Sequence, residues 1–240
     1  MAAFAHPAAD RGRAPAEDGQ CPGGRVAEAA ALSLGRGSPR EGIVAMTVAA
    51  RCSRSTGDHE VALRSLRTAA QHYAARGWPV LPGPMCDGLT TWHPASHAPL
   101  GPREPTVSRT DATVDRRVIS RWWSVHRQSI LAPAGGQFDV LRTPTYLGWR
   151  TLAAFDGGAP LGPVAISPRG ALFFVEPGTC ANHGTVLGVE FVPPGALVVL
   201  PPSRVVAGVV WWRISPLDRE VLGDGAEILG KLAELSGESG

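Results

Sequence analysis

"GGQFDVLRTP", residues 135–144, is the stretch on which the interpretation of both fold and function depends. Two glycines open a short apolar strand that carries one acid, Asp139, and one base, Arg142. A Gly pair of this kind is typical of a turn that leads one strand into the next. A carboxylate on such a strand is a candidate ligand for a divalent metal at a nucleotide site. The surrounding sequence decides between a metal site and the remnant of one.

Helical and irregular segments precede this stretch. Residues 58–77 carry apolar side chains at helical spacing, with Asp58 as the N-cap and Gly77 as the C-terminal stop. Residues 82–112 are dense in Pro, Gly, Ser and Thr without a period, which predicts a long irregular connection. A second helix is predicted over 114–126, with Thr113 as its cap.

Strands dominate the rest of the chain. A helix of about ten residues is predicted to begin near Thr145, and the strands "GPVAIS" (162–167) and "ALFFVE" (171–176) follow, joined by the turn "SPRG". Further apolar segments predict three more strands and a closing helix, at 188–192, 196–202, 205–215 and 217–235. Helices at both ends of a run of hairpin-like strands indicate an α+β domain over 58–240.

Residues 1–57 differ in composition from this domain. They are rich in Ala, Gly, Pro, Arg and Ser and poor in large apolar residues, which predicts disorder. Met46 is an alternative start, with the preceding residues as a leader that arises from an overlong start assignment; a transit peptide is the second interpretation. No run approaches the roughly 18 apolar residues of a membrane span, so we predict a cytoplasmic protein without a membrane partner.

The charge and cysteine content give little further indication of function. The net charge of +2 is too small to predict nucleic-acid binding, and Lys231 is the single lysine among the basic residues. The four cysteines are widely scattered, so a disulfide framework is not predicted. Cys86, His93 and His97 form a weak zinc candidate, and Cys180 with His183 a second possible pair. Their spacing departs from that of structural zinc sites, which favours loop residues without a metal.

Several catalytic classes lack their motifs. The chain has no nucleophile elbow, no Gly-rich phosphate loop and no H-E-x-x-H, which removes the basis for hydrolase, P-loop and zincin interpretations. "LPPSR", residues 200–204, places Ser203 and Arg204 just beyond an apolar strand, where they are candidates for holding a phosphate. A rigid double-Pro turn with solvent-facing polar residues is the favoured alternative.

The order of four segments carries a family resemblance. They are "HYAARGWPVLPG", "RWWSVHRQSILAPAGGQFDVL", "GPVAISPRGALFFVEPG" and "ALVVLPPSR". Together, over about residues 62–235, they resemble the N-terminal domain of bifunctional DNA primase/polymerases in the form found in many actinobacterial proteins. The resemblance implies an archaeo-eukaryotic primase-like fold, an α+β core of mostly antiparallel strands flanked by helices. It also implies acidic residues that bind divalent metals and a histidine that assists with the incoming nucleotide.

The first two motifs that the resemblance implies are altered here. An Asp-x-Asp at the end of an apolar strand is expected within "FDVLRTP". Counted from Asp139 the second position is Leu141, and counted from Arg142 it is Pro144, so neither register gives two carboxylates. The histidine of the second motif falls at about Leu172.

The remaining positions keep part of the pattern. Arg169 and Gly170 preserve the turn before the second motif, and Arg169 is a candidate phosphate ligand. Glu190 fits the third acid, whereas Val192 stands where a basic companion is expected. A two-metal site needs several anionic ligands, and Asp139 and Glu190 are the two catalytic and metal-binding candidates.

The leading hypothesis is therefore a catalytically degenerate member that acts as a nucleic-acid-binding or nucleotide-binding regulatory module. Phosphate contacts are expected from Arg169, Ser203 and Arg204, and the expected partners are DNA or nucleotides, with replication or mobile-element proteins as further candidates. Mg²⁺ or Mn²⁺ is expected only if the site is active.

Two alternatives stay open. One is an active primase or polymerase whose atypical metal site adds Asp156 or Asp218 to Asp139 and Glu190, although Asp156 fits a helix-ending turn and Asp218 fits a cap of the last helix. The other is an interaction protein that binds a partner through the tryptophan pairs Trp122/Trp123 or Trp211/Trp212.

Overall fold

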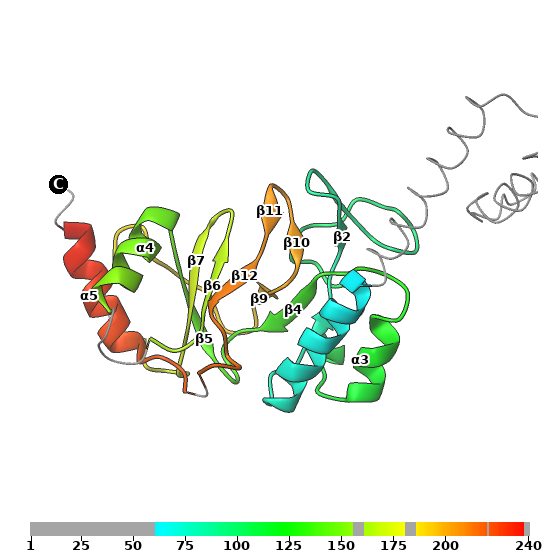
Figure 1. Cartoon of the computed structure of the whole chain (residues 1–240), viewed down its shortest axis with the longest axis horizontal. Coiled ribbons are helices and arrows are strands. Elements are labelled where there is room, and N and C mark those ends of the chain that lie inside the picture. Colours follow the sequence, from blue (N-terminus) through cyan, green and yellow to red (C-terminus); the bar gives the residue numbers. More distant parts are fainter. Residues whose placement is uncertain (1–60, 156–160, 181–185, 220, 238–240) are drawn as a thin grey trace, which may run out of the picture. The chain divides into compact units, whose positions relative to one another are not determined.

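The computed structural model describes residues 61–155, 161–180, 186–219 and 221–237. The leader expected at 1–57 and the acid Asp156 lie outside the described residues. The described part contains helices together with runs of antiparallel strands, which confirms the predicted α+β class. Figure 1 shows two helices on one side of a sheet and the remaining helices beyond its other side.

The largest element is a five-stranded sheet with the strand order β12-β6-β7-β5-β8. Its neighbouring strands all pair antiparallel. The strand bounds are β5 (Asp139–Thr143), β6 (Val164–Ser167), β7 (Gly170–Val175), β8 (Glu190–Phe191) and β12 (Trp211–Ile214). The predicted hairpin at "SPRG" is confirmed, because Ser167 pairs with Gly170 across the turn.

Two helices cover one face of this sheet. They are α4 (Thr145–Ala154) and α5 (Gly225–Gly237); they contact each other, and α4 also contacts β7. Side chains at alternate strand positions, such as Leu141 and Phe173, pack beneath them with Leu147 of α4 and Ile228 of α5. We call this side the helix-covered face.

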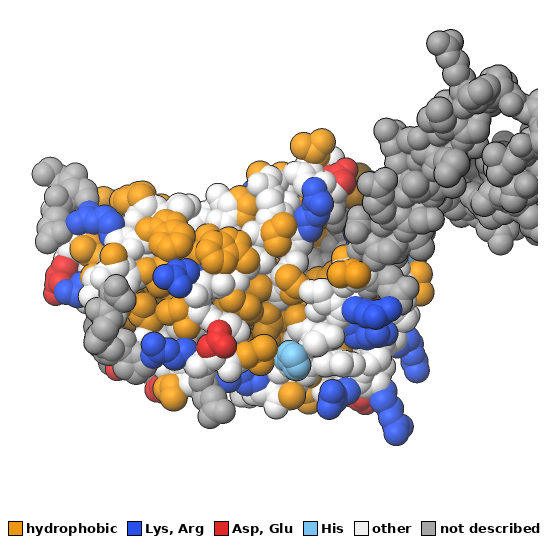
Figure 2. Space-filling view, in the orientation of Figure 1, with side chains coloured by type: hydrophobic (Ala, Val, Ile, Leu, Met, Phe, Trp, Pro, Cys, Tyr) orange, Lys and Arg blue, Asp and Glu red, His pale blue; other side chains and the backbone are white. Residues whose placement is uncertain are grey.

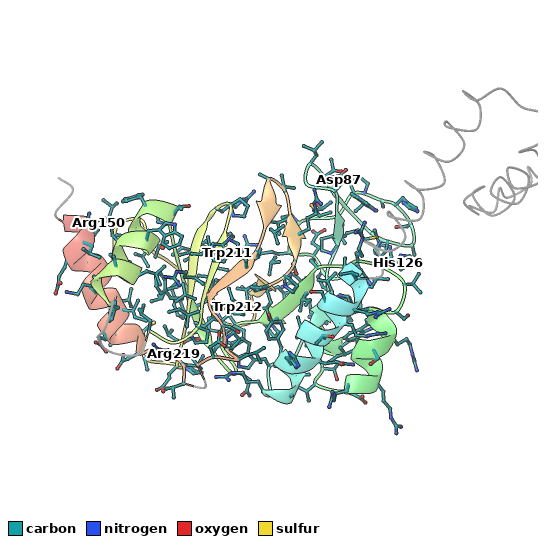
Figure 3. All side chains as sticks on the ribbon, viewed as in Figure 1. Asp87, His126, Arg150, Trp211, Trp212 and Arg219 are labelled. Atoms are coloured by element: carbon teal, nitrogen blue, oxygen red, sulfur yellow. The ribbon has the colours of Figure 1, made fainter. Side chains whose placement is uncertain are left out.

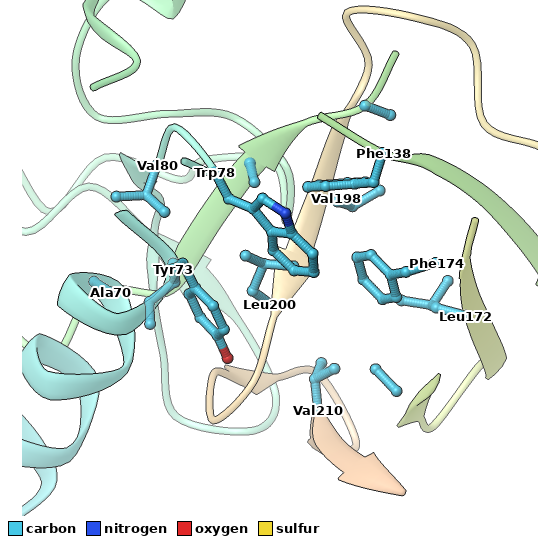
Figure 4. Packing of buried hydrophobic residues seen from close by; sticks show 14 of the residues in the cluster. Ala70, Tyr73, Trp78, Val80, Phe138, Leu172, Phe174, Val198, Leu200 and Val210 are labelled. Carbon is cyan, nitrogen blue, oxygen red and sulfur yellow. The ribbon is translucent and has the colours of Figure 1, made fainter. Parts of the chain in front are cut away.

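The opposite face packs against a second, three-stranded sheet of order β1-β4-β9. Its strands are β1 (Leu81–Pro82), β4 (Ile130–Pro133) and β9 (Leu197–Leu200). The 61–75 helix and α3 (Arg116–Trp122) also contribute to this core. Aromatic rings fill its centre, as Figure 4 shows for Tyr73, Trp78 and Phe174. We call this side of the five-stranded sheet the inner face.

The first helix follows the predicted pattern. Residues 61–75 are helical, and Leu66, Ala70 and Tyr73 are buried. Gly77 ends the helix with a φ of +83°, and the Trp78 backbone N–H donates to the Tyr73 carbonyl at 3.0 Å. A left-handed residue at this place satisfies carbonyls that the helix end leaves open.

The second helix differs from its prediction. α3 is shorter than 114–126, and the cap is Asp115, whose side chain accepts from the Arg117 and Val118 backbone N–H groups. Val114 and Val125 are exposed instead of facing the core. Trp123 is the inward member of the tryptophan pair, because its indole N–H donates to the buried Gln128 carbonyl at 2.9 Å.

The closing segments also differ from the predictions. The expected strand 205–215 is a short hairpin of β10 (Arg204–Val205) and β11 (Gly208–Val209), turned at Ala207 with a φ of +67°, followed by β12. The last helix begins at Gly225, so Asp218 does not cap it. Asp224 takes that place, since its carboxylate accepts from the Ala226 and Glu227 backbone N–H groups.

The predicted irregular connection at 82–112 contains short regular pieces. β2 (Met85–Cys86) pairs with β3 (Thr91–Trp92), and a 3-10 turn, η1, covers Arg109–Asp111. Within the described residues, no helix is both long and apolar enough to cross a membrane.

Candidate functional site

Three of the motif positions meet on one face of the five-stranded sheet. Arg142 on β5 pairs with Leu172 on β7 and, on its other side, with Glu190 on β8. Residues directly opposite each other in an antiparallel sheet share a face. Leu172 belongs to the inner core, so all three side chains lie on the inner face. The register that begins at Arg142 is therefore the one that joins the three motifs.

The centre of this row is an ion pair. The Arg142 Nη1 atom donates to Glu190 Oε1 at 2.9 Å and to Oε2 at 2.7 Å. The Arg142 side chain is 21% exposed and the Glu190 side chain 56% exposed, so the pair borders solvent. The Glu190 carboxylate at this point is thus occupied by a guanidinium group.

Arg142 also lines a hollow of about 110 Å³, and two further arginines line it. Arg103 comes from the loop after β3, and Arg169 from the turn between β6 and β7. Partial burial lowers the pKa of Arg103, and the nearby charges of Arg142 and Arg169 lower it further, while Glu190 raises it. An arginine stays protonated in proteins, so the hollow holds three positive charges close to one another. We call this hollow the arginine pocket.

Local backbone geometry holds Arg169 beside Arg142. Gly170 has a φ of +135°, and a Cβ atom there would lie 1.9 Å from the Thr143 carbonyl oxygen. Only a glycine accepts both the conformation and this close approach. The turn that carries Arg169 is therefore held against the end of β5. The floor of the pocket is apolar, with Leu172, Val198 and Val210 among its lining residues.

Asp139 occupies a different environment. It pairs with Val175, which packs in the helix-covered core, and it stands three residues from Arg142 on the same strand. Side chains an odd number of residues apart on a strand point to opposite faces. Asp139 is 4% exposed, and its Oδ2 atom accepts the Gly178 backbone N–H at 2.8 Å. The structure thus does not bring the Asp139 and Glu190 carboxylates together.

The turn that Asp139 holds connects β7 to the start of α5. Thr179 in this turn accepts the Gly225 backbone N–H at 2.9 Å, and Glu176 donates its backbone N–H to the Gly223 carbonyl at 2.9 Å. Cys180 lies nearby and is buried. Burial raises the pKa of its thiol to about 11, and the charge of Asp139 adds to this shift. Asp139 is thus placed as a structural carboxylate.

The three predicted phosphate ligands do not converge. Arg169 lines the arginine pocket, whereas Arg204 lines another hollow of about 430 Å³ that also contains Arg127. Ser203 is fully buried, and its hydroxyl oxygen accepts the Ile130 backbone N–H at 2.8 Å. Ser203 therefore fixes the turn after β9 to the start of β4, and its side chain does not face solvent.

The zinc candidates form no ligand set. His93 Nδ1 accepts backbone N–H groups of Ala95 and Ser96 at 3.3 Å each, and Cys86 Sγ accepts the Gly88 N–H at 3.3 Å. In the part of the chain that the structure describes, no group of three or more His, Cys, Asp or Glu side chains is placed to hold a metal. His183 lies outside the described residues.

The residues that sequence reasoning missed are the arginines of the pocket. In the sequence, Arg142 indicates only that an expected acid is missing, and nothing in the Pro-rich connection distinguishes Arg103 from its neighbours. The position of Arg142 opposite Leu172 and Glu190 depends on the pairing of β5 with β7 and β8, and no short turn in the sequence fixes these registers. The place of Arg103 depends on the path of a long loop.

The fold and this site define a class of protein: an α+β domain whose motif positions meet between two antiparallel sheets. A family model described as "Bifunctional DNA primase/polymerase, N-terminal" (Prim-Pol) matches residues 70–223, more than half of the chain. The chain belongs to the Prim-Pol family. No curated protein and no solved structure matches it in the other two comparisons.

Proposed function

We propose that this chain is a catalytically degenerate Prim-Pol domain that binds nucleotide or nucleic-acid phosphates and acts as a binding or regulatory module. One observation carries the proposal: Arg142 stands where the three motif positions meet, and it is paired with Glu190. The family is that of a DNA primase/polymerase, and the loss of nucleotidyl transfer is our inference from this pair.

The residues at this place do not fit the Mg²⁺ or Mn²⁺ that an active site would use. These ions take oxygen ligands, above all carboxylates. The pocket is lined by three guanidinium groups and by no carboxylate, and the neighbouring carboxylate of Glu190 is already engaged by Arg142. A divalent cation placed among three fixed positive charges is repelled by each of them. Asp139 faces the other side of the sheet and cannot serve as a second ligand.

The same arrangement suits an anion. Arg103, Arg142 and Arg169 against one glutamate leave an excess of positive charge at the rim of an apolar hollow. Guanidinium groups bind phosphate oxygens in a bidentate manner. The pocket volume of about 110 Å³ is smaller than that of a typical ligand site. The pocket therefore accommodates a phosphate group and the adjoining part of a larger ligand, whose remainder lies outside it. DNA or nucleotides in the cytoplasm, with replication or mobile-element proteins as further partners, remain the proposed interactions.

Primer synthesis and primer extension with labelled nucleotides test the catalytic half of the proposal. With Mg²⁺ or Mn²⁺, the wild-type chain should give no product above a blank. Metal-dependent extension that Glu190→Ala or Asp139→Ala abolishes would contradict the proposal.

Equilibrium binding of a nucleoside triphosphate in EDTA tests the other half. The wild type should bind without metal, and Arg142→Ala should weaken binding by about 10-fold or more, because charged hydrogen bonds are worth about 1.5–3 kcal/mol. Arg117→Ala is the matched control, since Arg117 is exposed on α3 and does not line the pocket. Equal losses in Arg142→Ala and Arg117→Ala would overturn binding at this pocket.

A further inference from the structure

Phosphate binding does not explain the apolar floor of the arginine pocket. The floor residues Leu172, Val198 and Val210 are buried, and each lies in a strand or next to one. Leu172 on β7 stands directly opposite Arg142 on β5, so the floor and a guanidinium group are neighbours. A phosphate group binds through charged hydrogen bonds and makes no favourable contact with aliphatic carbon. The floor therefore fits a ligand that carries an aliphatic group beside its anion.

One wall of the pocket is the β10–β11 hairpin, which is held on two sides. Val206 in the turn of this hairpin lines the hollow. A Cβ atom at Gly208 would lie 2.9 Å from Pro168 Cγ, so the hairpin packs closely on the turn between β6 and β7. On the other side, the Ala207 backbone N–H donates to the Gly88 carbonyl at 2.8 Å. The wall is therefore fixed in position before a ligand binds.

The lining of the pocket is poorly suited to a nucleobase. Among the described residues that line it, none is aromatic and none carries an amide side chain. The hydroxyl of Ser167 is engaged within its own turn, because it donates to the Gly170 carbonyl at 3.0 Å and accepts the Arg169 backbone N–H at 3.2 Å. The hollow of about 110 Å³ is also smaller than the roughly 150 Å³ cavity that binds benzene in another protein. A branched aliphatic side chain therefore suits the floor better than an aromatic base.

The charge at the mouth of the pocket favours a ligand with two negative charges. Three guanidinium groups and the neighbouring carboxylate of Glu190 leave an excess of two positive charges. Within the described residues, Glu190 is the ion-pair partner of Arg142, and neither Arg103 nor Arg169 forms an ion pair with an acid. Clusters of arginines recognise acidic peptide segments, because carboxylates accept from guanidinium groups in a bidentate manner.

We propose that the arginine pocket binds the C-terminus of a partner protein whose chain ends in an acidic residue followed by leucine, isoleucine or valine. The terminal carboxylate and the side chain branch from one carbon atom, so they reach the arginines and the floor together. The preceding acidic side chain supplies the second negative charge. This inference rests on the proposed function in one respect, that Arg142 is open to an anion. It adds regulation of that site, because such a terminus and a nucleotide compete for the same guanidinium groups.

Fluorescence anisotropy of a labelled peptide, Gly-Ser-Gly-Ser-Glu-Leu with a free C-terminus, titrated with the full chain in EDTA, tests the ligand. The C-terminal amide, and the peptide with serine in place of leucine, should each bind about 10-fold more weakly, because each loses one of the two contacts. Isocaproate, which is leucine without its amino group, should compete poorly because it lacks the second charge. Displacement by isocaproate as effective as displacement by unlabelled peptide would assign the pocket to a free acid and overturn the proposal.

Two exposed valines of the hairpin provide matched variants of the protein. Val206 is 42% exposed and lines the pocket, whereas Val209 is 46% exposed and does not line it. Val206→Ser should weaken peptide binding by about 5-fold and leave nucleotide binding in EDTA unchanged, because only the peptide places an aliphatic group in the pocket. Val209→Ser should change neither affinity. Equal losses of peptide affinity in the two variants would contradict binding in the pocket.

A second pair of variants excludes non-specific apolar binding. Figure 2 shows hydrophobic side chains exposed over the middle of one face of the molecule. Trp211, which Figure 3 labels, is 44% exposed and does not line the pocket, so Trp211→Ala should leave peptide affinity unchanged. Arg169→Ala should weaken peptide binding by about 10-fold, because it removes a charged hydrogen bond. Peptide binding that survives Arg169→Ala and is lost in Trp211→Ala would refute the assignment.

The peptide and nucleotide titrations fail independently of each other. Nucleotide binding without peptide binding would overturn this inference and leave the proposed function standing. Peptide binding without nucleotide binding would support this inference and contradict the proposed function. Where both bind, unlabelled peptide should displace the nucleotide, and simultaneous binding of the two would contradict a shared pocket.

Discussion

The two faces of strand β5 carry opposite charges for different purposes. On the helix-covered face, Asp139 is buried and accepts a backbone N–H, which anchors the turn before α5. On the inner face, Arg142 borders solvent, pairs with Glu190 and lies beside two further arginines. An acid on the expected strand is therefore not by itself evidence of a metal site. Its face decides whether it can meet the other ligands.

The largest expected effect is a loss of stability, and it tests whether each face of the five-stranded sheet is covered by a hydrophobic core. Phe173 and Phe174 are adjacent on β7, fully buried, and point into the helix-covered and inner cores respectively. Alanine at either position should lower the free energy of unfolding by about 3–5 kcal/mol. Chemical denaturation measures this loss, and Phe→Leu at each position is the milder variant. A large loss at one position and almost none at the other would break the two-core description.

The reactivities of two cysteines test the environment of Asp139, because Cys180 is buried near Asp139 and Cys86 is half-buried elsewhere. The pKa of Cys180 is raised to about 11, so its thiol stays protonated at neutral pH and its reactive thiolate appears only as the pH approaches that value. At pH 8 its thiolate fraction should be about 100-fold below that of an ordinary cysteine. Iodoacetamide labelling followed by mass spectrometry should therefore modify half-buried Cys86 before Cys180. Equal rates at the two thiols would contradict this assignment.

The structural role of Asp139 predicts a loss of stability without a loss of binding. Asp139→Ala leaves the Gly178 N–H without its charged acceptor, which should cost about 1.5–3 kcal/mol in the free energy of unfolding. Nucleotide binding in EDTA should be unchanged. Denaturation and binding measured on one preparation separate the two roles. A stable variant that no longer binds nucleotide would assign Asp139 to the site.

The sequence predicted elements that have local signals. The 61–75 helix, the stop at Gly77, the ten-residue helix α4 and the "SPRG" hairpin all agree with the structure. The end of the chain was less predictable. Ala207 has a left-handed backbone conformation, which in a sequence is usually indicated by a glycine, and the turn at Ala207 splits the expected strand into β10 and β11.

The candidate site was predictable only in part. The separation of Asp139 and Arg142 by three residues already indicates opposite faces of a strand. The grouping of Arg103 and Arg169 around Arg142 could not be inferred, since it depends on a long loop and on a turn that packs on the end of β5. Ser203 gave a misleading signal, because a hydroxyl beyond a strand end serves equally well as a buried acceptor for a backbone N–H.

Nucleotide binding by Glu190→Gln tests the central claim, that a cationic pocket has replaced a metal site. The substitution removes the carboxylate that competes with phosphate for Arg142. Because an exposed ion pair is worth about 0.2–1 kcal/mol, binding in EDTA should tighten by up to about 5-fold. Wild-type binding that requires Mg²⁺ or Mn²⁺, and that Glu190→Gln abolishes, would show that Glu190 is a metal ligand and would contradict the account.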